Sequence, residues 1–326
     1  MAKPSGITTG DGTEAHPWEV HNYEEIKWAC EDAEAIPLGQ TINSDYVYIL
    51  LVNDIDCKSY DATFTWYIAL THSIHLDLGT HTIKTFYIQK STYMFVNAAT
   101  VACDYYVGNG NILNVYGNPD GGSAGLFAMT TNPSHTSVID NISFSIDLTR
   151  ISVIARQNMA DNSIYIIKNC AFWVQGDRTS ETITIDRSKL FDFCGSMNCC
   201  DFYFNDLSVF NAHILFGSAT VLTTLSNCRF QGTYIYDSNA STSYVLFAYA
   251  TTVNCVIDAT FETLAGRLIW CSNDAAASGI YNETKIPTTL QLPNKLIACL
   301  PSDMDMRVNP NANIRLDDLG FPVTKG

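Results

Sequence analysis

Carboxylates recur at related positions along the chain, which is what a polysaccharide-cleaving enzyme would need. The candidates are Asp140, Asp147, Asp177, Asp201 and Asp206. Asp147, Asp177 and Asp206 follow recurring asparagines by six or eight residues, so we expect them to line one ridge. Two carboxyl groups about 5–9 Å apart could cleave a glycosidic bond, with Arg178 or Lys168 as the basic partner of a lyase. Because the net charge is −15, we interpret these acids instead as solvated surface groups.

Three histidines fall close together early in the chain, at His72, His75 and His81. Their spacing matches no zinc-binding pattern, so the sequence favours histidines that face outward from strands or turns. No Gly-x-Ser-x-Gly motif occurs, and Gly108-Asn-Gly110 lacks the lysine and helix of a phosphate loop, so it is interpreted as a turn. We therefore expect no metal, no cofactor and no catalysis.

The chain has 11 cysteines, an odd number, and no pair of Cys-x-x-Cys motifs. Cys170, Cys228 and Cys255 each lie two residues before a phenylalanine or an isoleucine, inside apolar segments. A disulfide or zinc framework is therefore disfavoured. We expect thiols that act as small core hydrophobes, which suits assembly in a reducing cytoplasm.

Composition disfavours several classes of protein. The 326 residues include 18 Lys and Arg against 33 Asp and Glu, so there is no basic excess to neutralise nucleic-acid phosphates. With 47% hydrophobic and 16% charged residues, the chain does not resemble a disordered protein. The best apolar run, 46–52, is too short to span a membrane. Residues 1–12 lack the apolar segment of a secretory signal, so we do not expect export by that route.

The elements that position these residues are set by a repeat. Asparagines recur at intervals of 27, 28, 29, 29, 27 and 28 residues. The series is Asn114, Asn141, Asn169, Asn198, Asn227, Asn254 and Asn282. Their surroundings repeat as well, because Ile139-Asp-Asn-Ile-Ser-Phe144 resembles Ile167-Lys-Asn-Cys-Ala-Phe172 and Leu225-Ser-Asn-Cys-Arg-Phe230. A fixed internal period indicates a repeat architecture.

The alternation around each asparagine predicts its role. Side chains of one parity in a strand face the same side, yet Ile167 and Cys170 are both apolar and differ in parity. Both can face inward if the backbone bends at Asn169, since asparagine tolerates the left-handed conformation of such a bend. We expect the seven asparagines to form this turn and to bond amide to amide between coils. Ordinary surface-loop asparagines are the alternative.

One coil of this length cannot bury its apolar face alone, whereas coils stacked about 4.8 Å apart share a continuous core. Apolar doublets between the asparagines, such as Leu126-Phe127 and Leu246-Phe247, predict a further strand in each coil. The sequence therefore predicts an all-β fold, a single-stranded parallel β-helix with about 28 residues per coil, and right-handed winding is the default. A β-sandwich is the main alternative, but it predicts no fixed period.

The ends of the chain have different patterns. Asn22 and Glu25 have the form of a capping box, which predicts a helix over residues 22–35 that closes the amino-terminal end, with Trp18 packed beside it. Its apolar face would consist of Ile26, Ala29, Cys30 and Ala33. Prolines accumulate after residue 286 and remove ladder donors. The predicted organisation is residues 1–40 as an arm and capping helix, 41–285 as the β-helix, and 286–326 as a carboxyl-terminal cap or arm.

Both ends resemble a known group of proteins. The opening Gly10-Asp-Gly-Thr-Glu-Ala-His-Pro-Trp-Glu-Val20, the string Leu76-Asp-Leu-Gly-Thr-His-Thr-Ile83 and the ending Leu319-Gly-Phe-Pro-Val323 are similar to those of right-handed parallel β-helix structural proteins of tailed bacteriophages. Related repeat proteins occur in gut bacteria. The resemblance implies a virion decoration, head-fibre, tail or spike component, often a trimer. The chain shows no recognisable catalytic signature of the spikes that degrade polysaccharide.

Exposed aromatic residues are a further functional indication. Seventeen tyrosines exceed what a narrow coil interior holds, and tyrosine is favoured at interfaces. We expect these tyrosines to lie outside: Tyr105, Tyr106, Tyr203, Tyr234 and Tyr236. A subunit interface or a sugar-stacking surface would fit them.

Three functions follow as hypotheses. The first is a non-enzymatic structural protein of a bacteriophage virion, assembled in the host cytoplasm as a homo-oligomer, with a trimer favoured and other virion proteins as partners. The second is a tailspike-like protein that binds or degrades a host glycan. The third is a bacterial cell-surface adhesin. Neither nucleic acid nor a membrane is an expected partner.

Overall fold

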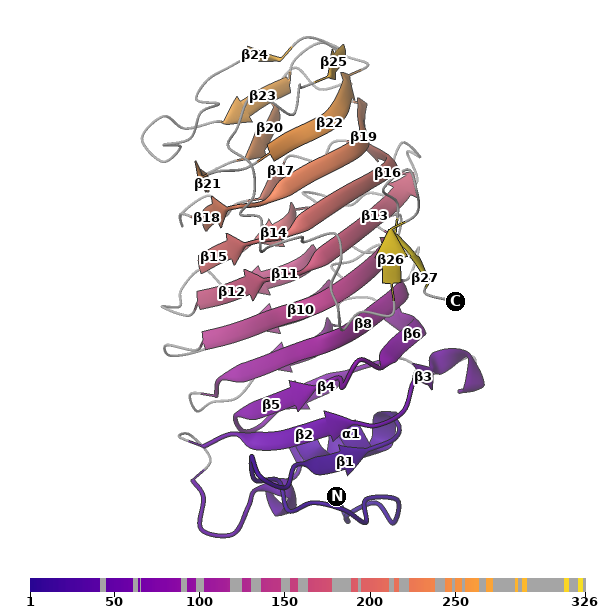
Figure 1. The fold of residues 1–326 in the computed structure, drawn as a ribbon, viewed down its shortest axis with the longest axis vertical. Coiled ribbons are helices and arrows are strands. Elements are labelled where there is room, and N and C mark those ends of the chain that lie inside the picture. Colours follow the sequence, from indigo (N-terminus) through magenta and orange to yellow (C-terminus); the bar gives the residue numbers. More distant parts are fainter. Residues whose placement is uncertain are drawn as a thin grey trace.

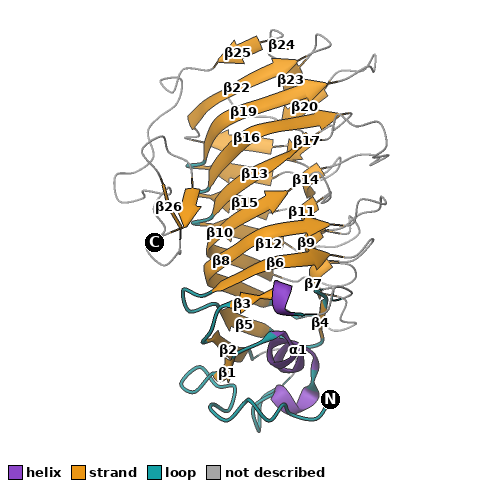
Figure 2. Cartoon of the chain, turned by 90° about the vertical axis from the view of Figure 1, so that its right-hand side faces the viewer, coloured by secondary structure: helices purple, strands orange, loops and turns teal. Residues whose placement is uncertain are grey.

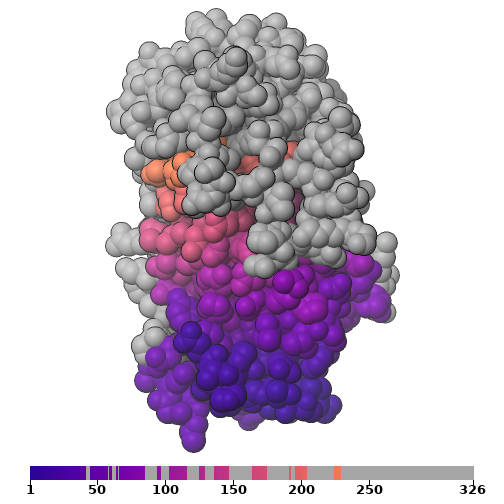
Figure 3. Space-filling view, viewed as in Figure 1, coloured from indigo at the N-terminus to yellow at the C-terminus, as the bar shows by residue number. Residues whose placement is uncertain are grey.

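The computed structural model is a rod of stacked coils (Figure 1). It describes residues 1–41, 45–60, 64, 66–88, 93–97, 103–117, 125–129, 136–147, 153–157, 164–177, 189–192, 195–210, 214–216, 223–237, 244–247, 250–253, 256–263, 268–271, 285–286, 289–291, 314–316 and 322–324. Figure 3 shows the amino-terminal residues gathered at one end of the rod. Among the described residues, no helix is both long and apolar enough to cross a membrane.

One large parallel sheet runs the length of the rod. In most coils it contains two strand segments separated by a bend. The segments before the bend are β2 (Val47–Leu51), β5 (Ile74–Asp77), β12 (Ile164–Lys168), β15 (Gly195–Asn198), β18 (Thr223–Ser226) and β21 (Ala250–Val253). Those after it are β3 (Ile55–Asp56), β6 (Thr82–Ile88), β13 (Ala171–Asp177), β16 (Asp201–Phe210), β19 (Arg229–Asp237) and β22 (Val256–Thr263). The strands β8 (Tyr105–Gly117) and β10 (Thr136–Asp147) run through the bend without interruption.

A second sheet forms the opposite wall (Figure 2). Its parallel strands are β4 (Ile68–Leu70), β7 (Tyr93–Asn97), β9 (Gly125–Met129), β11 (Val153–Gln157), β14 (Lys189–Asp192), β17 (Ile214–Phe216), β20 (Tyr244–Phe247) and β23 (Leu268–Cys271). The apolar doublets of the sequence lie in these strands, as predicted. The two sheets and the parallel pairing confirm the parallel β-helix.

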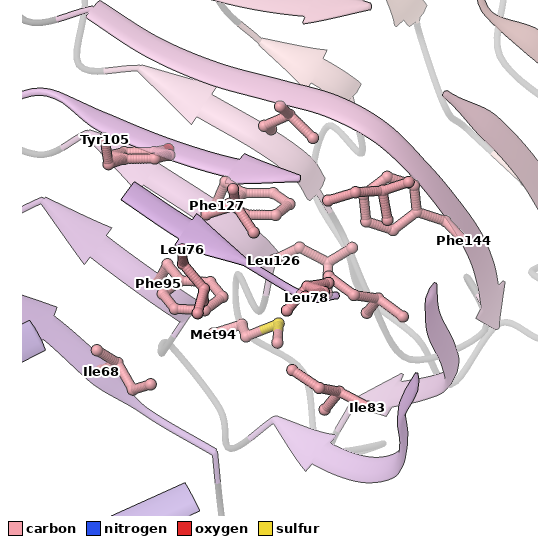
Figure 4. Close-up of a cluster of buried hydrophobic side chains, with 14 of the residues drawn as sticks. Ile68, Leu76, Leu78, Ile83, Met94, Phe95, Tyr105, Leu126, Phe127 and Phe144 are labelled. Carbon is pink, nitrogen blue, oxygen red and sulfur yellow. The ribbon is translucent and has the colours of Figure 1, made fainter. Parts of the chain in front are cut away.

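The core lies between the two sheets and continues from coil to coil (Figure 4). Phe172 of β13 stacks on Phe144 of β10 and on Phe202 of β16, with ring centroids 4.8 and 4.9 Å apart and planes within 6° of parallel. Phe95 and Phe127 of the second sheet stack in the same way at 5.8 Å. Identical residues at register positions therefore make a column of rings, which buries large apolar area at each step.

A short helix closes the amino-terminal end (Figure 2). The helix α1 (Tyr23–Glu31) begins at Asn22, whose side chain accepts a hydrogen bond from the Glu25 backbone N–H at 3.0 Å. Ile26, Ala29 and Cys30 are fully buried. Trp18 packs edge to face on Trp28 and donates its indole N–H to the Ala35 carbonyl, so the predicted packing of Trp18 beside the helix is confirmed.

The predicted helix over 22–35 is shorter in the structure. Asp32 has an extended backbone with ψ 134°, which ends α1, and its side chain caps the separate 3-10 helix η1 (Ala33–Ala35) by accepting from the Glu34 N–H. Ala33 is therefore exposed, and Ala35 is buried in its place. A second 3-10 helix, η2 (Cys57–Ser59), follows β3.

Strand pairing also bears on where the β-helix begins and ends. The strand β1 (Trp18–Val20) pairs in parallel with β2, so the stack begins ahead of residue 41. At the other end β24 (Lys285–Ile286) and β25 (Thr289–Gln291) add antiparallel edges to the two sheets. The hairpin of β26 (Ile314–Leu316) and β27 (Pro322–Thr324) lies back beside the first sheet, near β10 (Figures 1 and 2). It is an arm rather than a further coil.

Candidate functional site

The bend in the first sheet is a column of left-handed residues. Asn141, Asn169 and Asn227 have φ of 56°, 53° and 52°. The flanking register pairs place Asn141 opposite Asn169, and they place both in line with Asn109, which has φ 60°. These asparagines form the turn that the alternation predicts, because Ile139 and Ile142 on either side of Asn141 are both buried.

Side-chain hydrogen bonds join successive turns. Asn141 Nδ2 donates to Asn109 Oδ1 at 3.0 Å. Asn169 Nδ2 donates to a carboxylate, Asp140 Oδ1, at 2.9 Å. The ladder is therefore partly amide to amide, as predicted, and partly amide to carboxylate.

Two predicted asparagines occupy other positions. In the coil of Asn198 the left-handed residue is Cys199, with φ 54°, and Asn198 ends strand β15 one residue earlier. Asn114 has φ 53°, but it lies five residues beyond Asn109, where the register between β8 and β10 shifts. It is a bulge residue, and Asn109 takes its place in the column. Asn254 and Asn282 lie outside the described residues.

The signal for Asn109 was present in the sequence. It lies between two glycines, Gly108 and Gly110, and 32 residues before Asn141. A period fixed near 28 residues selects Asn114 instead. Because the coil between Asn109 and Asn141 is longer than 28 residues, a search at a constant interval misses Asn109.

An aromatic ladder lies on the outer face of the amino-terminal coils. Tyr48, His75 and Tyr106 are register partners on β2, β5 and β8. Their rings stack at centroid distances of 5.0 Å and 4.1 Å. Because the ring faces cover one another, the ladder presents ring edges to solvent. Burial lowers the pKa of His75, although Asp77 and Glu14 oppose the effect.

Asp140 joins this ladder to the asparagine column. Its carboxylate accepts from the Tyr106 hydroxyl at 3.3 Å and pairs with Lys168 Nζ at 3.2 Å, in addition to Asn169. Burial, followed by the charges of Asp140 and Asp77, raises the pKa of Tyr106. All three interactions of Asp140 hold neighbouring coils together.

The other predicted acids do not form one ridge. Asp147 is the register partner of Gln175, and Asp177 is the partner of Ser208 beyond a register shift. Asp206 lies within the register shift between Phe204 and Leu207 of β16. The expectation of a single ridge is therefore wrong: Asp177 lies two residues beyond the partner of Asp147, and a bulge between β13 and β16 offsets Asp206 from Asp177. Asp201 is fully buried, and Arg178 lies outside the described residues.

The histidines differ in their surroundings. His72 is buried, not outward-facing as expected, and its Nε2 lies 2.8 Å from the Ala29 carbonyl of α1. His75 is in the aromatic ladder, and His81 lies 3.2 Å from the exposed Asp54 carboxylate. In the part of the chain that the structure describes, no group of three or more His, Cys, Asp or Glu side chains could hold a metal ion.

The expected exterior tyrosines also separate into two groups. Tyr106 is half-buried on the outer face, whereas Tyr105 and Tyr203 are buried. Tyr105 shares the inward parity of Ile74 and lies 3.1 Å from the Tyr165 hydroxyl, so the expectation for it is wrong. The side chains of Tyr234 and Tyr236 lie outside the described set.

The cysteines with described side chains are buried thiols. Seven cysteines with described side chains are buried and form no disulfide: Cys30, Cys57, Cys103, Cys170, Cys199, Cys200 and Cys228. Burial, then hydrogen bonding with Cys170 and Cys228, raises the pKa of Cys200 well above that of an ordinary thiol. A protonated thiol in the core is a poor nucleophile. These residues therefore behave as the core hydrophobes that the sequence predicts.

Comparisons with known proteins agree with the fold. No protein-family model and no curated protein matches the chain. Among solved structures, the chain is similar to a "putative immunoglobulin A1 protease" from Bacteroides ovatus, with a TM-score of 0.52 and 15% sequence identity. The similarity covers 98% of this chain and 95% of that chain. At this identity it shows a shared fold and nothing about activity.

Proposed function

We propose that the protein is a non-enzymatic structural component of a bacteriophage virion: a capsid decoration, head-fibre or tail protein. The observation that carries the non-enzymatic role is the engagement of Asp140. This carboxylate of the candidate surface is held by Tyr106, Lys168 and Asn169, so its lone pairs serve contacts between coils. A catalytic acid or base needs a lone pair or proton directed at substrate.

The virion setting rests on the sequence resemblance at the two ends of the chain. Assembly in the host cytoplasm is supported by the buried thiols, since a reducing compartment keeps cysteines out of disulfides. A homo-oligomer, with a trimer favoured, remains the expected assembly, together with contacts to other virion proteins.

The name of the Bacteroides ovatus protein suggests peptidase activity there. In this chain, the buried thiols with described side chains offer no exposed cysteine nucleophile.

Purified virions test this function. Mass spectrometry of density-purified particles is expected to detect the protein in a fixed ratio to the major capsid protein. Analytical ultracentrifugation of the recombinant chain is expected to give about three times the monomer mass of 36.0 kDa. Absence from virions, with detection in the host envelope instead, would contradict the virion role and favour the adhesin.

A glycan-binding role is the second candidate, because the aromatic ladder and Asp77 lie on one outer face. Incubation with host capsular polysaccharide, followed by size analysis of the chains and by titration calorimetry, separates binding from cleavage. Loss of binding in Tyr106→Ala with retention in Ile164→Ala, a change at an exposed site on the same face, would favour the glycan role. If the protein neither binds the polysaccharide nor shortens its chains, the glycan role is excluded.

A further inference from the structure

An uncharged column runs along the outer face of the first sheet, on the strands before the bend. These strands follow one another along the rod (Figure 1), and their register places one outward-facing residue of each coil in line. The column consists of Tyr48, His75, Tyr106, Val138, Ile166, Ser196 and Thr224. Burial lowers the pKa of His75 from its ordinary value of 6.5, so His75 is also neutral at pH 7.

The middle of this column is apolar and partly open to solvent. Ile139 and Ile167 are buried in the core, so strand alternation directs their neighbours Val138 and Ile166 outward. Both outward side chains are half-buried. They continue the stack of rings that ends at Tyr106. A contiguous apolar surface of this kind marks an interaction site.

Charge decides which kind of partner fits the uncharged column. The chain has a net charge of −15, which drives identical copies apart unless they meet where charge is sparse. The uncharged column is such a surface. A basic partner, by contrast, would be attracted to acidic surface and would gain nothing from this column. The column therefore fits a second copy of this chain.

The residues on either side of the column support contact between copies. The residues two positions before it form the first flank: Tyr46, Ser73, Asp104 and Thr136. The residues two positions after it form the second flank: Leu50, Asp77, Gly108 and Asp140. Asp104 of the first flank shares its coil with a glycine of the second. Asp77 and Asp140 of the second flank share their coils with hydroxyl residues of the first, so no coil has an acid in both flanks.

We propose that the uncharged column lines the threefold axis of a parallel homotrimer of this chain. A rotation axis along the rod keeps every residue at its own level. Each residue of the column then faces its counterparts in the other two copies, and the first flank of one copy faces the second flank of the next. Flanking acids of neighbouring copies do not meet at one level, which avoids like-charge contacts. This inference rests on the homo-oligomer of the proposed function and assigns its contact to one face.

Analytical ultracentrifugation of the full chain tests the axis. Val138→Asp places three like charges at one level of the axis, and it is expected to shift the protein from about three times 36.0 kDa to the monomer mass. Tyr67→Asp is the matched control, because Tyr67 is 37% exposed and lies outside the column and its flanks. It adds the same charge and is expected to remain trimeric. Circular dichroism verifies that both variants fold.

A second measurement tests the orientation and does not depend on the folding of Val138→Asp. Val138→Cys and Ile166→Cys place thiols at two levels of the axis, whereas the native cysteines with described side chains are buried. After mild oxidation, non-reducing electrophoresis is expected to show disulfide-linked dimers for both variants above the wild-type background, because two of the three thiols at each level can pair. An antiparallel pair of copies brings like residues together at only one level, so linkage in just one variant would overturn the proposal.

The outcomes separate this inference from the proposed function. A trimer that persists unchanged in Val138→Asp would overturn the axis and leave the homo-oligomer standing. A monomeric wild type, or linkage in neither cysteine variant, would also overturn the axis. In that case detection of the protein in purified virions would still support the virion function.

Discussion

Asn227 Nδ2 donates to Asn198 Oδ1 at 3.0 Å, although the register places Asn227 opposite Cys199. The same oxygen also accepts from the Ser226 hydroxyl at 3.0 Å. Asn109 combines two tasks, because it has a left-handed backbone and its Oδ1 accepts from the next amide, that of Asn141. In the coil of Asn198 these two tasks are divided. Cys199 takes the left-handed backbone, and Asn198 supplies the acceptor for the next amide.

This division predicts opposite responses to glycine and alanine at two nearby asparagines. At Asn227, with φ 52°, alanine must hold the left-handed backbone at a cost of about 1–2 kcal/mol, whereas glycine holds it freely. Asn227→Gly is expected to be more stable than Asn227→Ala by about 1 kcal/mol in denaturant unfolding.

Asn198 is the control for that comparison. It ends a strand and is not among the residues with positive φ. Glycine in a strand is weaker than alanine, so Asn198→Gly is expected to be less stable than Asn198→Ala. Glycine favoured at both positions, or at neither, would contradict the assignment of the turn to Cys199.

The phenylalanine column predicts a large effect of one substitution. Phe172 lies between Phe144 and Phe202, and Phe191 approaches it edge to face at 5.4 Å. Phe172→Ala is expected to cost about 3–5 kcal/mol, because it removes transfer energy and leaves a cavity. Phe172→Leu should cost less. Ile164→Ala, at a position 38% exposed, is expected to stay within about 0.5 kcal/mol of wild type. Equal losses at the two positions would contradict a packed column.

The fold was predictable because one sequence pattern recurs at a nearly constant interval in several coils. The apolar residues on both sides of Asn141 and of Asn169 can all face inward only if the strand changes its inward-facing parity at the asparagine. Stacked coils place these changes in line. The N-cap at Asn22 was equally readable, because its interactions are local. The end of α1 was not, since Asp32 can continue a helix or cap the next turn, and tertiary packing decides.

The outer surface was harder to predict for a related reason. Asp177 and Asp206 each lie eight residues after Asn169 and Asn198, but the register between β13 and β16 shifts, and Asp177 lies opposite Ser208. A bulge changes which residues are neighbours without changing the sequence interval. Likewise the parity of Tyr105 is set by its partners Ile74 and Tyr165, which lie in other coils.

The surroundings of Asp140 predict that its stabilising effect comes from the amide and not from the ion pair. Lys168 is 41% exposed, so Lys168→Met is expected to change stability by less than about 1 kcal/mol. Asp140→Ala leaves the Asn169 amide and the Tyr106 hydroxyl without their acceptor and is expected to cost about 1–3 kcal/mol. Asp140→Asn keeps an oxygen that can accept from Asn169. Its loss of stability should therefore lie between those of Lys168→Met and Asp140→Ala. Denaturant midpoints measure the order of stability of the three variants. A larger loss of stability for Lys168→Met than for Asp140→Ala would contradict this interpretation.

His72 predicts a dependence of the amino-terminal cap on pH. Its Nε2 lies 2.8 Å from the Ala29 carbonyl of α1, and its Nδ1 lies 3.1 Å from the Thr71 hydroxyl. Burial lowers the pKa of His72 from its ordinary value of 6.5. The native state therefore favours neutral imidazole, and the stabilising contribution is fully present above pH 6.5. It is lost as the pH falls below that value towards the folded pKa, by at most about 1.4 kcal/mol per pH unit.

The measurement is thermal unfolding from pH 8 to pH 5 for the wild type and for His72→Gln, whose amide can still donate to Ala29. We expect the two proteins to differ little in pH dependence above pH 7. Below pH 6.5 the wild type should lose stability faster than His72→Gln, because only the imidazole must be protonated in the unfolded chain and kept neutral in the cap. His16→Gln, at an exposed position, controls for the loss of one histidine. Parallel curves for wild type and His72→Gln across the whole range would show that His72 does not couple protonation to the packing of α1 on the first coils.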